Sequence, residues 1–366
     1  MKLIINFILT LKCPDFIILF RNQRKQKREF AASGQYLKGQ MMDFSIRKTA
    51  SLLLAGLLTF SACACSSGIA GQDNGRLKVV TTIFPEYDWV KEIAGDRIGD
   101  IDLTLLLDNG VDMHSFQPSA QDIIRISSCD VFVYVGGESD EWVEDALREA
   151  VNKDMKVVNL MEVLGDDVVE EETVEGMQAE NEEGPEETEY DEHVWLSPLN
   201  ARRLVTGIAD AMAEADPGNA SVYKDNAAAY NKKLDELDGR YRSAVMNAAK
   251  DTVVFCDRFP FRYLTDELQL DYYAAFAGCS AETEASFETV IFLAGKIDEL
   301  DLKTVFVIEG SDQKVAQTVI GNTNSKDQEI LVLDSMQSTT SSDSAKGVTY
   351  MSVMEKNLEV LTKALG

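Results

Sequence analysis

Residues 220–249 read ASVYKDNAAAYNKKLDELDGRYRSAVMNAA. Good helix formers fill this stretch, and apolar or aromatic side chains recur in it at steps of three and four residues. The recurring side chains are Tyr223, Ala227, Tyr230, Leu234, Leu237, Tyr241 and Val245. The spacing predicts one long amphipathic helix near the middle of the chain.

On both sides of this helix, short β-branched runs alternate with helical patterns. Before it, we expect strands at 77–83, 101–107, 131–135 and 156–160 and helices at 87–93, 120–127, 142–151 and 199–215. After it, we expect strands at 252–256, 272–276, 304–308 and 330–333 and helices at 261–268, 287–300, 313–323 and 348–365. The alternation predicts an α/β fold with two lobes, each built on a mainly parallel sheet and joined by the long helix. We place the first lobe at 76–215, the linking helix at 216–250 and the second lobe at 251–366.

Composition limits the classes of partner. The chain has 366 residues with 35 Lys and Arg against 62 Asp and Glu, a formal net charge of -27. Such a charge repels phosphate backbones, which argues against nucleic acid as a partner, and it attracts cations. Many of the acidic residues lie in the segment 162–192, which we expect to be a flexible, self-repelling loop.

The N-terminal region has the pattern of an export signal. After Met41, a short basic region precedes the apolar run SLLLAGLLTF at 51–60, which small residues and Cys63 follow. A cysteine at this point predicts a bacterial lipoprotein signal over 41–65, with lipid on Cys63 and Cys65 as a second candidate. We interpret residues 1–40 as an upstream extension from an early start codon, and 66–75 as a flexible tether.

Two histidines are the only imidazoles in the chain, and both lie in turn-like motifs near acidic residues. His114 lies in GVDMHSFQPS at 110–119, just beyond an expected strand, and His193 lies in DEHVWLSP at 191–198. Ligands of α/β proteins bind beyond the carboxyl ends of strands. Imidazole is the commonest neutral ligand of zinc and related metals, so the pair predicts a metal site.

These two motifs resemble those of the zinc and manganese binding lipoproteins of bacterial ABC transporters. Met113 and Glu192 stand where that family usually has proline. Gly136, Gly137, Glu141 and Trp142 resemble a further family segment, and the long central helix is also a family trait. The resemblance covers roughly residues 76–366, and it implies two metal ligands from the first lobe, His114 and His193.

The resemblance also implies two ligands from the second lobe. The fourth family ligand matches Asp334, just after the last expected strand. The third falls on Arg258, whose guanidinium has no free lone pair for a cation. We therefore expect either Asp257 or water to complete the site, with Arg258 paired to a carboxylate such as Glu309. Cys129, Cys256 and Cys279 are too widely spaced to predict a disulfide framework, and spacing leaves open whether the last two pair.

By this resemblance the cargo is a divalent transition metal, with Zn(II) expected and Mn(II) or Fe(II) as alternatives. The protein would be a monomer, held by its lipid on the outer face of the bacterial cell membrane. It would deliver the metal to an ABC permease driven by a cytoplasmic ATPase. We expect no enzymatic activity, because the sequence contains no HExxH or GxSxG motif. A zinc-dependent hydrolase and a metal-free surface adhesin are the alternatives from other classes.

Overall fold

Two four-stranded parallel sheets form the framework of the computed structural model, which describes residues 75–178, 189–280 and 284–366. The first sheet has the order β2-β1-β3-β4, from β1 (Leu77–Thr81), β2 (Ile101–Leu105), β3 (Val131–Tyr134) and β4 (Lys156–Asn159). The second has the order β6-β5-β7-β8, from β5 (Thr252–Phe259), β6 (Asp271–Ala277), β7 (Thr304–Ile308) and β8 (Glu329–Leu333). The described strands pair in parallel throughout, which confirms the predicted α/β class.

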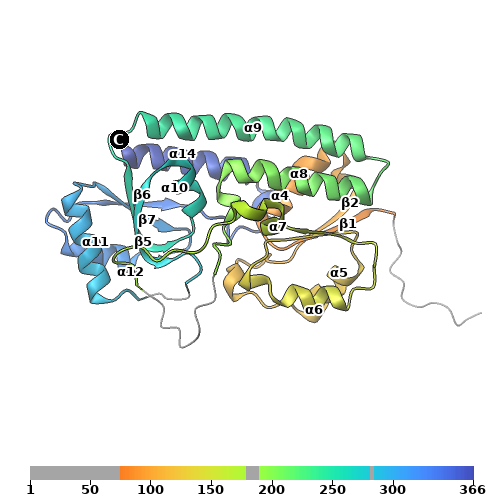
Figure 1. The fold of residues 1–366 in the computed structure, drawn as a ribbon, viewed down its shortest axis with the longest axis horizontal. Coiled ribbons are helices and arrows are strands. Elements are labelled where there is room, and N and C mark those ends of the chain that lie inside the picture. The colour runs from red at the N-terminus through yellow and green to blue at the C-terminus, as the bar shows by residue number, and fades with distance from the viewer. Residues whose placement is uncertain (1–74, 179–188, 281–283) are drawn as a thin grey trace, which may run out of the picture. The chain divides into compact units, whose positions relative to one another are not determined.

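Helices cover both sheets (Figure 1). Those before the long helix are α4 (Phe84–Ala94), α5 (Ala120–Ser128), α6 (Trp142–Arg148), α7 (Leu160–Leu164) and α8 (Pro198–Ala215). Those after it are α10 (Arg262–Leu268), α11 (Phe287–Glu299), α12 (Lys314–Asn322), α13 (Ser341–Ala345) and α14 (Tyr350–Leu365). Side-chain caps fix several of the starts: Ser197 accepts a hydrogen bond from the amide of Asn200, and Thr349 accepts one from Ser352.

The long helix is α9 (Ala220–Met246), and it runs alongside both lobes (Figure 1). The predicted stripe is buried at Tyr223, Ala227, Tyr230, Leu234, Leu237 and Tyr241. It packs on α4 and α8 of the first lobe and on α10 and α14 of the second. The Tyr241 hydroxyl donates to the carbonyl of Met354 in α14 at 2.6 Å. The helix therefore ties the two lobes to each other as well as connecting them in sequence.

Buried side chains form two clusters. The larger contains residues of the first sheet, α8, α9, α14 and one face of the second sheet, among them Val79, Leu204 and Phe255. The smaller lies on the other face of the second sheet, under α11 and α12, and includes Val305 and Leu293. The larger core thus passes from one lobe into the other without a break.

The structure differs from expectation at the acidic segment 162–192. Its first three residues belong to α7, and a one-turn 3-10 helix follows at Gly165–Asp167. Glu170 and Tyr190 then form an antiparallel bridge, which fixes both ends of the segment against each other. α4 also begins earlier than predicted, at Phe84, because Pro85 fits the first turn of a helix, where no amide donor is needed.

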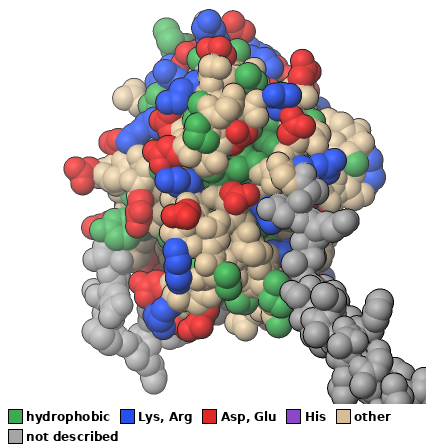
Figure 2. Space-filling view, turned by 90° about the vertical axis from the view of Figure 1, so that its right-hand side faces the viewer, with side chains coloured by type: hydrophobic (Ala, Val, Ile, Leu, Met, Phe, Trp, Pro, Cys, Tyr) green, Lys and Arg blue, Asp and Glu red, His purple; other side chains and the backbone are tan. Residues whose placement is uncertain are grey.

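The surface at the end of the first lobe is mixed in charge. Figure 2 shows acidic and basic side chains interspersed over the end of the first lobe. Within the described residues, every helix lacks the length or the apolar character that crossing a bilayer requires. The predicted signal, the tether and Cys63 lie outside the described residues.

Candidate metal centre

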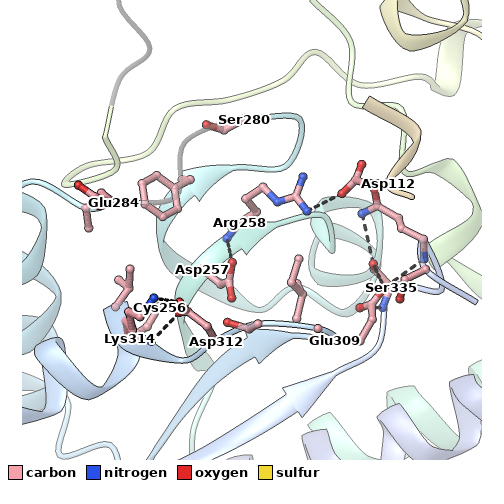
Figure 3. Close-up of a pocket in the computed structure, with 18 of the residues that line it drawn as sticks. Asp112, Cys256, Asp257, Arg258, Ser280, Glu284, Glu309, Asp312, Lys314 and Ser335 are labelled. Carbon is pink, nitrogen blue, oxygen red and sulfur yellow. Dashed lines mark hydrogen bonds and ion pairs between the residues drawn. The ribbon is translucent and has the colours of Figure 1, made fainter. Parts of the chain in front are cut away.

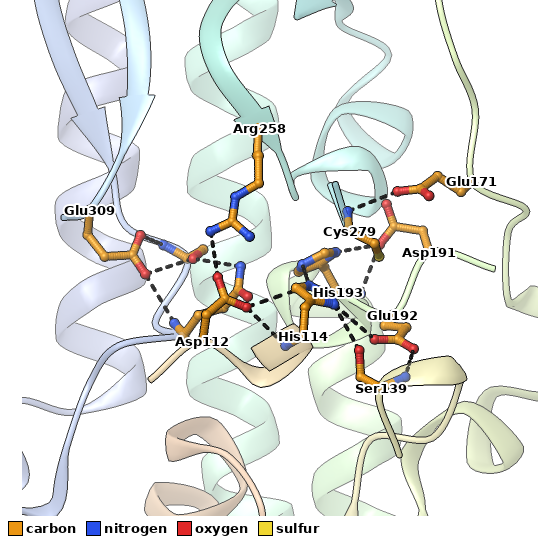
Figure 4. A network of polar contacts seen from close by, with 12 residues as sticks. Asp112, His114, Ser139, Glu171, Asp191, Glu192, His193, Arg258, Cys279 and Glu309 are labelled. Atoms are coloured by element: carbon orange, nitrogen blue, oxygen red, sulfur yellow. Dashed lines mark hydrogen bonds and ion pairs between the residues drawn. The ribbon is translucent and has the colours of Figure 1, made fainter. Parts of the chain in front are cut away.

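The two histidine rings lie close together beyond the carboxyl ends of the first sheet's strands, tilted by 55° to each other. His114 belongs to a 3-10 turn (Met113–Ser115) beyond β2, where the Asp112 carboxylate accepts the His114 amide at 3.1 Å. His193 directly precedes a second 3-10 turn (Val194–Leu196) that leads into α8. The two Nε2 atoms are 3.3 Å apart, and the side chains converge in Figure 4. The structure therefore brings together the two residues on which the sequence hypothesis rested.

The other ring nitrogen of each histidine is occupied. His193 is fully buried, and its Nδ1 lies 3.0 Å from Oδ1 of Asp191, which also accepts the His193 amide at 2.8 Å. Nδ1 of His114 lies 2.8 Å from the Ser139 hydroxyl. Partners on Nδ1 orient an imidazole and leave Nε2 for a metal. The arrangement presents two ring nitrogens to one point in space, as a shared cation requires.

Charge on the two rings is strongly unequal. Burial, followed by repulsion from His193, lowers the pKa of His114 to about 3. Burial also disfavours a charge on His193, but the adjoining Asp191 carboxylate outweighs it, and the pKa of His193 is raised above its usual value. The two shifts run in opposite directions, so His114 is the ring that more readily stays neutral and keeps a lone pair for a cation.

Cys279 is the third potential ligand at this point. It follows β6, and one donor atom each from His114, His193 and Cys279 lie within 4.8 Å of one another. Among the described residues no other group of three or more His, Cys, Asp or Glu side chains is as close. Sequence reasoning missed Cys279, although its place just after an expected strand was the same signal that singled out His114.

Carboxylates surround the three donors. A cavity of about 270 Å³ is lined by His114, Cys279, Ser139, Tyr190 and the four acids Glu138, Glu171, Glu189 and Glu192. Glu192 is 2% exposed; one of its oxygens accepts the Ser139 amide at 2.8 Å. The other oxygen accepts no hydrogen bond from the described part of the chain and lies 3.6 Å from Nδ1 of His114. Burial raises the pKa of both Glu192 and Glu171. A cation in the cavity would offset this buried negative charge.

The predicted ligands of the second lobe lie outside that group of donors. Asp257 borders a larger cavity of about 840 Å³, and its carboxylate accepts the amide of Arg258 at 2.9 Å (Figure 3). Asp334 follows β8, and its carboxylate accepts the amide of Met336 at 2.8 Å. The Asp334 carboxylate thus stabilises the turn after β8, and the Asp257 carboxylate lies on β5 where its pairing with β6 is irregular.

Arg258 has a different partner from the expected one. Its guanidinium pairs with the Asp112 carboxylate of the first lobe, beside His114 (Figure 4). Glu309, the expected partner, instead accepts hydrogen bonds from the amide and hydroxyl of Ser335, each at 2.7 Å. The ion pair joins the two lobes, and local sequence does not predict which side chains of the two lobes lie close together. Cys256 and Cys279 are both free thiols.

Known proteins share this fold and much of this sequence. The zinc-binding lipoprotein AdcA of Streptococcus pneumoniae is 34% identical over 321 residues, which are 86% of this chain and 60% of that protein. The high-affinity zinc uptake system protein ZnuA of Bacillus subtilis is 30% identical over 316 residues, 86% of this chain and 96% of that protein. The crystal structure of the Zn(II)-bound ZnuA-like domain of Streptococcus pneumoniae AdcA has a TM-score of 0.62 at 29% identity, over 80% of this chain and 99% of that one.

A family model described as the periplasmic zinc-uptake complex component A covers residues 79–364, nearly the whole described region. The match includes both histidine turns, both sheets and the long helix. With such coverage and with relatives at 30% identity or more, the chain belongs to the zinc-uptake complex component A family.

Proposed function

We propose that this protein is the extracytoplasmic solute-binding component of an ABC transporter and that it captures Zn(II) for delivery to a membrane permease. The observation that carries the proposal is the convergence of the His114 and His193 ring nitrogens at 3.3 Å, beside a cavity rich in carboxylates. Two nitrogens bound to one tetrahedral zinc ion at about 2.0–2.1 Å lie roughly 3.3–3.4 Å apart. The two rings are therefore already spaced as ligands of one ion.

The proposed cargo follows from the donor types. Imidazole nitrogen suits zinc, whereas manganese prefers a larger shell of oxygen donors. The names of the relatives support zinc, since the two proteins named above are described as a zinc-binding lipoprotein and a zinc uptake system protein. Mn(II) and Fe(II) are the alternatives that a binding experiment must test.

The proposed role is carriage and not turnover. A catalytic zinc site keeps an open position for water and places a general base beside it. Here Asp191 holds His193 and Asp112 holds the His114 turn. Glu192 has one oxygen that accepts no hydrogen bond from the described residues, and that oxygen lies beside Nδ1 of His114, the ring nitrogen that faces away from the proposed ion. We propose accordingly that the protein binds and releases its ion unchanged.

The proposed setting is the outer face of the cell membrane. Lipid on Cys63 would anchor a monomer there, within reach of a permease and its cytoplasmic ATPase. The lipoprotein description of the Streptococcus pneumoniae relative supports the anchor.

Calorimetric titration of the metal-stripped full chain with Zn(II) and with Mn(II) tests the proposal. We expect one tight Zn(II) site that the His114→Ala/His193→Ala variant loses, because both nitrogen donors go. Asp257→Asn, in the separate larger cavity, is the matched control for the alternative ligand predicted from sequence. Zinc affinity that survives the double histidine change would contradict the proposal.

A further inference from the structure

We propose that Cys279 supplies the third protein ligand, so that the cargo site consists of two imidazoles and one thiolate. The inference rests on the proposed function and names its ligand set. Its first support is the group of donor atoms within 4.8 Å that joins Cys279 to both histidines. Figure 4 shows Cys279 beside His193, from the turn that follows β6.

The turn that carries Cys279 is built for close approach to the histidine. A Cβ added at Gly278 would come within 3.1 Å of Cε1 and 3.2 Å of Nδ1 of His193, and within 3.0 Å of the Phe259 carbonyl. Only glycine fits there without displacing the ring or the strand. The Cys279 amide also donates to the Glu171 carboxylate at 3.0 Å, which holds the turn from the first lobe's side.

The second lobe offers few other metal-binding side chains near the two histidines. Arg258, at the position that the family resemblance assigns to a ligand, is a cation already paired with Asp112. The carboxylates of Asp257 and Asp334 accept the backbone amides of nearby residues, Arg258 and Met336. Among the described His, Cys, Asp and Glu side chains of the second lobe, Cys279 is the one grouped with the histidine pair.

A second feature of the same cavity points to a cation. One oxygen of Glu192 accepts no hydrogen bond from the described residues, although Glu192 is only 2% exposed. That side chain lines the cavity together with His114 and Cys279. Buried carboxylate oxygens are rarely left without a partner, and a bound ion would supply one.

Binding of the metal by Cys279 replaces a proton and involves no redox step. The thiol proton leaves to solvent as the sulfur–metal bond forms, so the cysteine contributes one negative charge to the site. A thiolate binds zinc and other ions that prefer soft ligands tightly, and it adds little to the affinity for Mn(II). The proposed ligand set therefore makes the site selective between the two metals that the histidines alone leave open.

Co(II) titration of the full chain tests the thiolate, since Co(II) occupies zinc sites and reports its ligands by absorption. We expect visible d–d bands together with a near-ultraviolet sulfur-to-cobalt charge-transfer band. Cys279→Ser should lose the charge-transfer band and bind Zn(II) at least tenfold more weakly, with Mn(II) binding almost unchanged. Cys256→Ala, which removes the other second-lobe thiol, should retain both bands.

The outcomes separate the two proposals. Absence of d–d bands in the unmodified protein would overturn the zinc-carrier function itself. Bands of d–d type with no charge transfer, or a charge-transfer band that survives in Cys279→Ser, would overturn thiolate ligation and leave the carrier function standing. Alkylation followed by peptide mass spectrometry gives a check without variants. Zn(II) should protect the Cys279 peptide, and equal labelling with and without zinc would also overturn thiolate ligation.

Discussion

His114 and His193 reach a common point through local turns that set their backbones. His114 lies within a short 3-10 turn, and His193 directly precedes one. In both cases an aspartate two residues earlier accepts the histidine's backbone amide, at 3.1 Å for His114 and 2.8 Å for His193. The repeated arrangement fixes where both rings leave the backbone. The scarcity of histidine and these two motifs made the pair predictable from sequence.

The ion pair of Arg258 and Asp112 adjoins the same centre and affects its charge. Asp112 lies 3.9 Å from Nε2 of His114, so its carboxylate would attract a bound cation if the guanidinium did not compensate it. We expect Arg258→Gln to raise Zn(II) affinity roughly threefold to tenfold, on the order of 1 kcal/mol for one partly exposed charge. Titration calorimetry measures the change.

Arg262→Gln is the control for that substitution, because Arg262 pairs with Glu172 and Asp266 away from the histidines. Its zinc affinity should match that of the unmodified protein. Lower affinity in Arg258→Gln would show instead that the guanidinium serves the site by holding Asp112 and the His114 turn.

The other site residues were harder to predict for a physical reason. Cys279, Arg258 and Asp334 lie in the second lobe, and their relation to the histidines depends on how the two lobes pack. A pattern along the chain reports which strand end a residue follows. It does not report which turn faces the other lobe, so the ligand role of Asp334 stays a prediction. Arg258 does pair with a carboxylate, but with that of Asp112 in place of the suggested Glu309.

At the scale of elements, α4 begins with a buried acid. The Glu86 carboxylate accepts the amides of Thr82 at 2.7 Å and of Ile83 at 3.2 Å, before the helix. It is fully buried, and burial, with Asp140 nearby, raises the pKa of Glu86 to about 8. The carboxyl group is therefore protonated in the folded protein at a pH where it is ionised in the unfolded chain.

We expect Glu86→Gln to flatten the pH dependence of stability. The raised pKa contributes stability in full below about pH 4.5, and this contribution is lost as pH rises through about 8. A single proton held only by the folded state changes the free energy of unfolding by about 1.4 kcal/mol per pH unit. Urea unfolding from pH 5 to 8 should show a slope less negative by up to that amount in the variant.

Glu92→Gln on the same helix is the matched control, since Glu92 is only partly buried and pairs with Lys233. Its slope should follow that of the unmodified protein. A Glu86→Gln slope that also follows it would mean that Glu86 releases its proton in the folded state.

Long periodic elements were the most predictable. The helix predicted at 220–249 is observed as α9 at Ala220–Met246. The agreement is close because the repeat of apolar side chains is a strong signal within the helix's own sequence. The 3-10 turns that carry the histidines have no such period. The acidic segment was predicted as one loop from its charge and its glycine and proline residues, and neither gives a signal for the bridge of Glu170 and Tyr190 that fixes its ends.

For the whole molecule, the decisive feature is the core that both lobes share. The larger cluster extends from Leu204 of the first lobe, through α9, to Phe255 in the second sheet. Separating the lobes would expose this apolar surface to water at a cost that scales with its area. The two lobes should therefore behave as one cooperative unit.

Differential scanning calorimetry of the full chain checks this. We expect one transition for the described region, and Zn(II) should raise its midpoint because the ion binds only the folded state. Leu204→Ala in the first lobe and Val305→Ala in the second should each lower the temperature of that same midpoint. Each should reduce the free energy of unfolding by about 1–5 kcal/mol. Two transitions, each sensitive to only one substitution, would contradict a shared core.

Because the lobes share one core, the shape that a docking partner meets should change little when an ion binds. On the proposed function, what would change is the electrostatic potential at the mouth of the acid-lined cavity, where a divalent ion would arrive and protons would leave. A permease that must distinguish loaded from empty receptors would then respond to that potential and not to a closed shape. Such a distinction weakens as salt screens it, so productive docking would be most selective at low ionic strength.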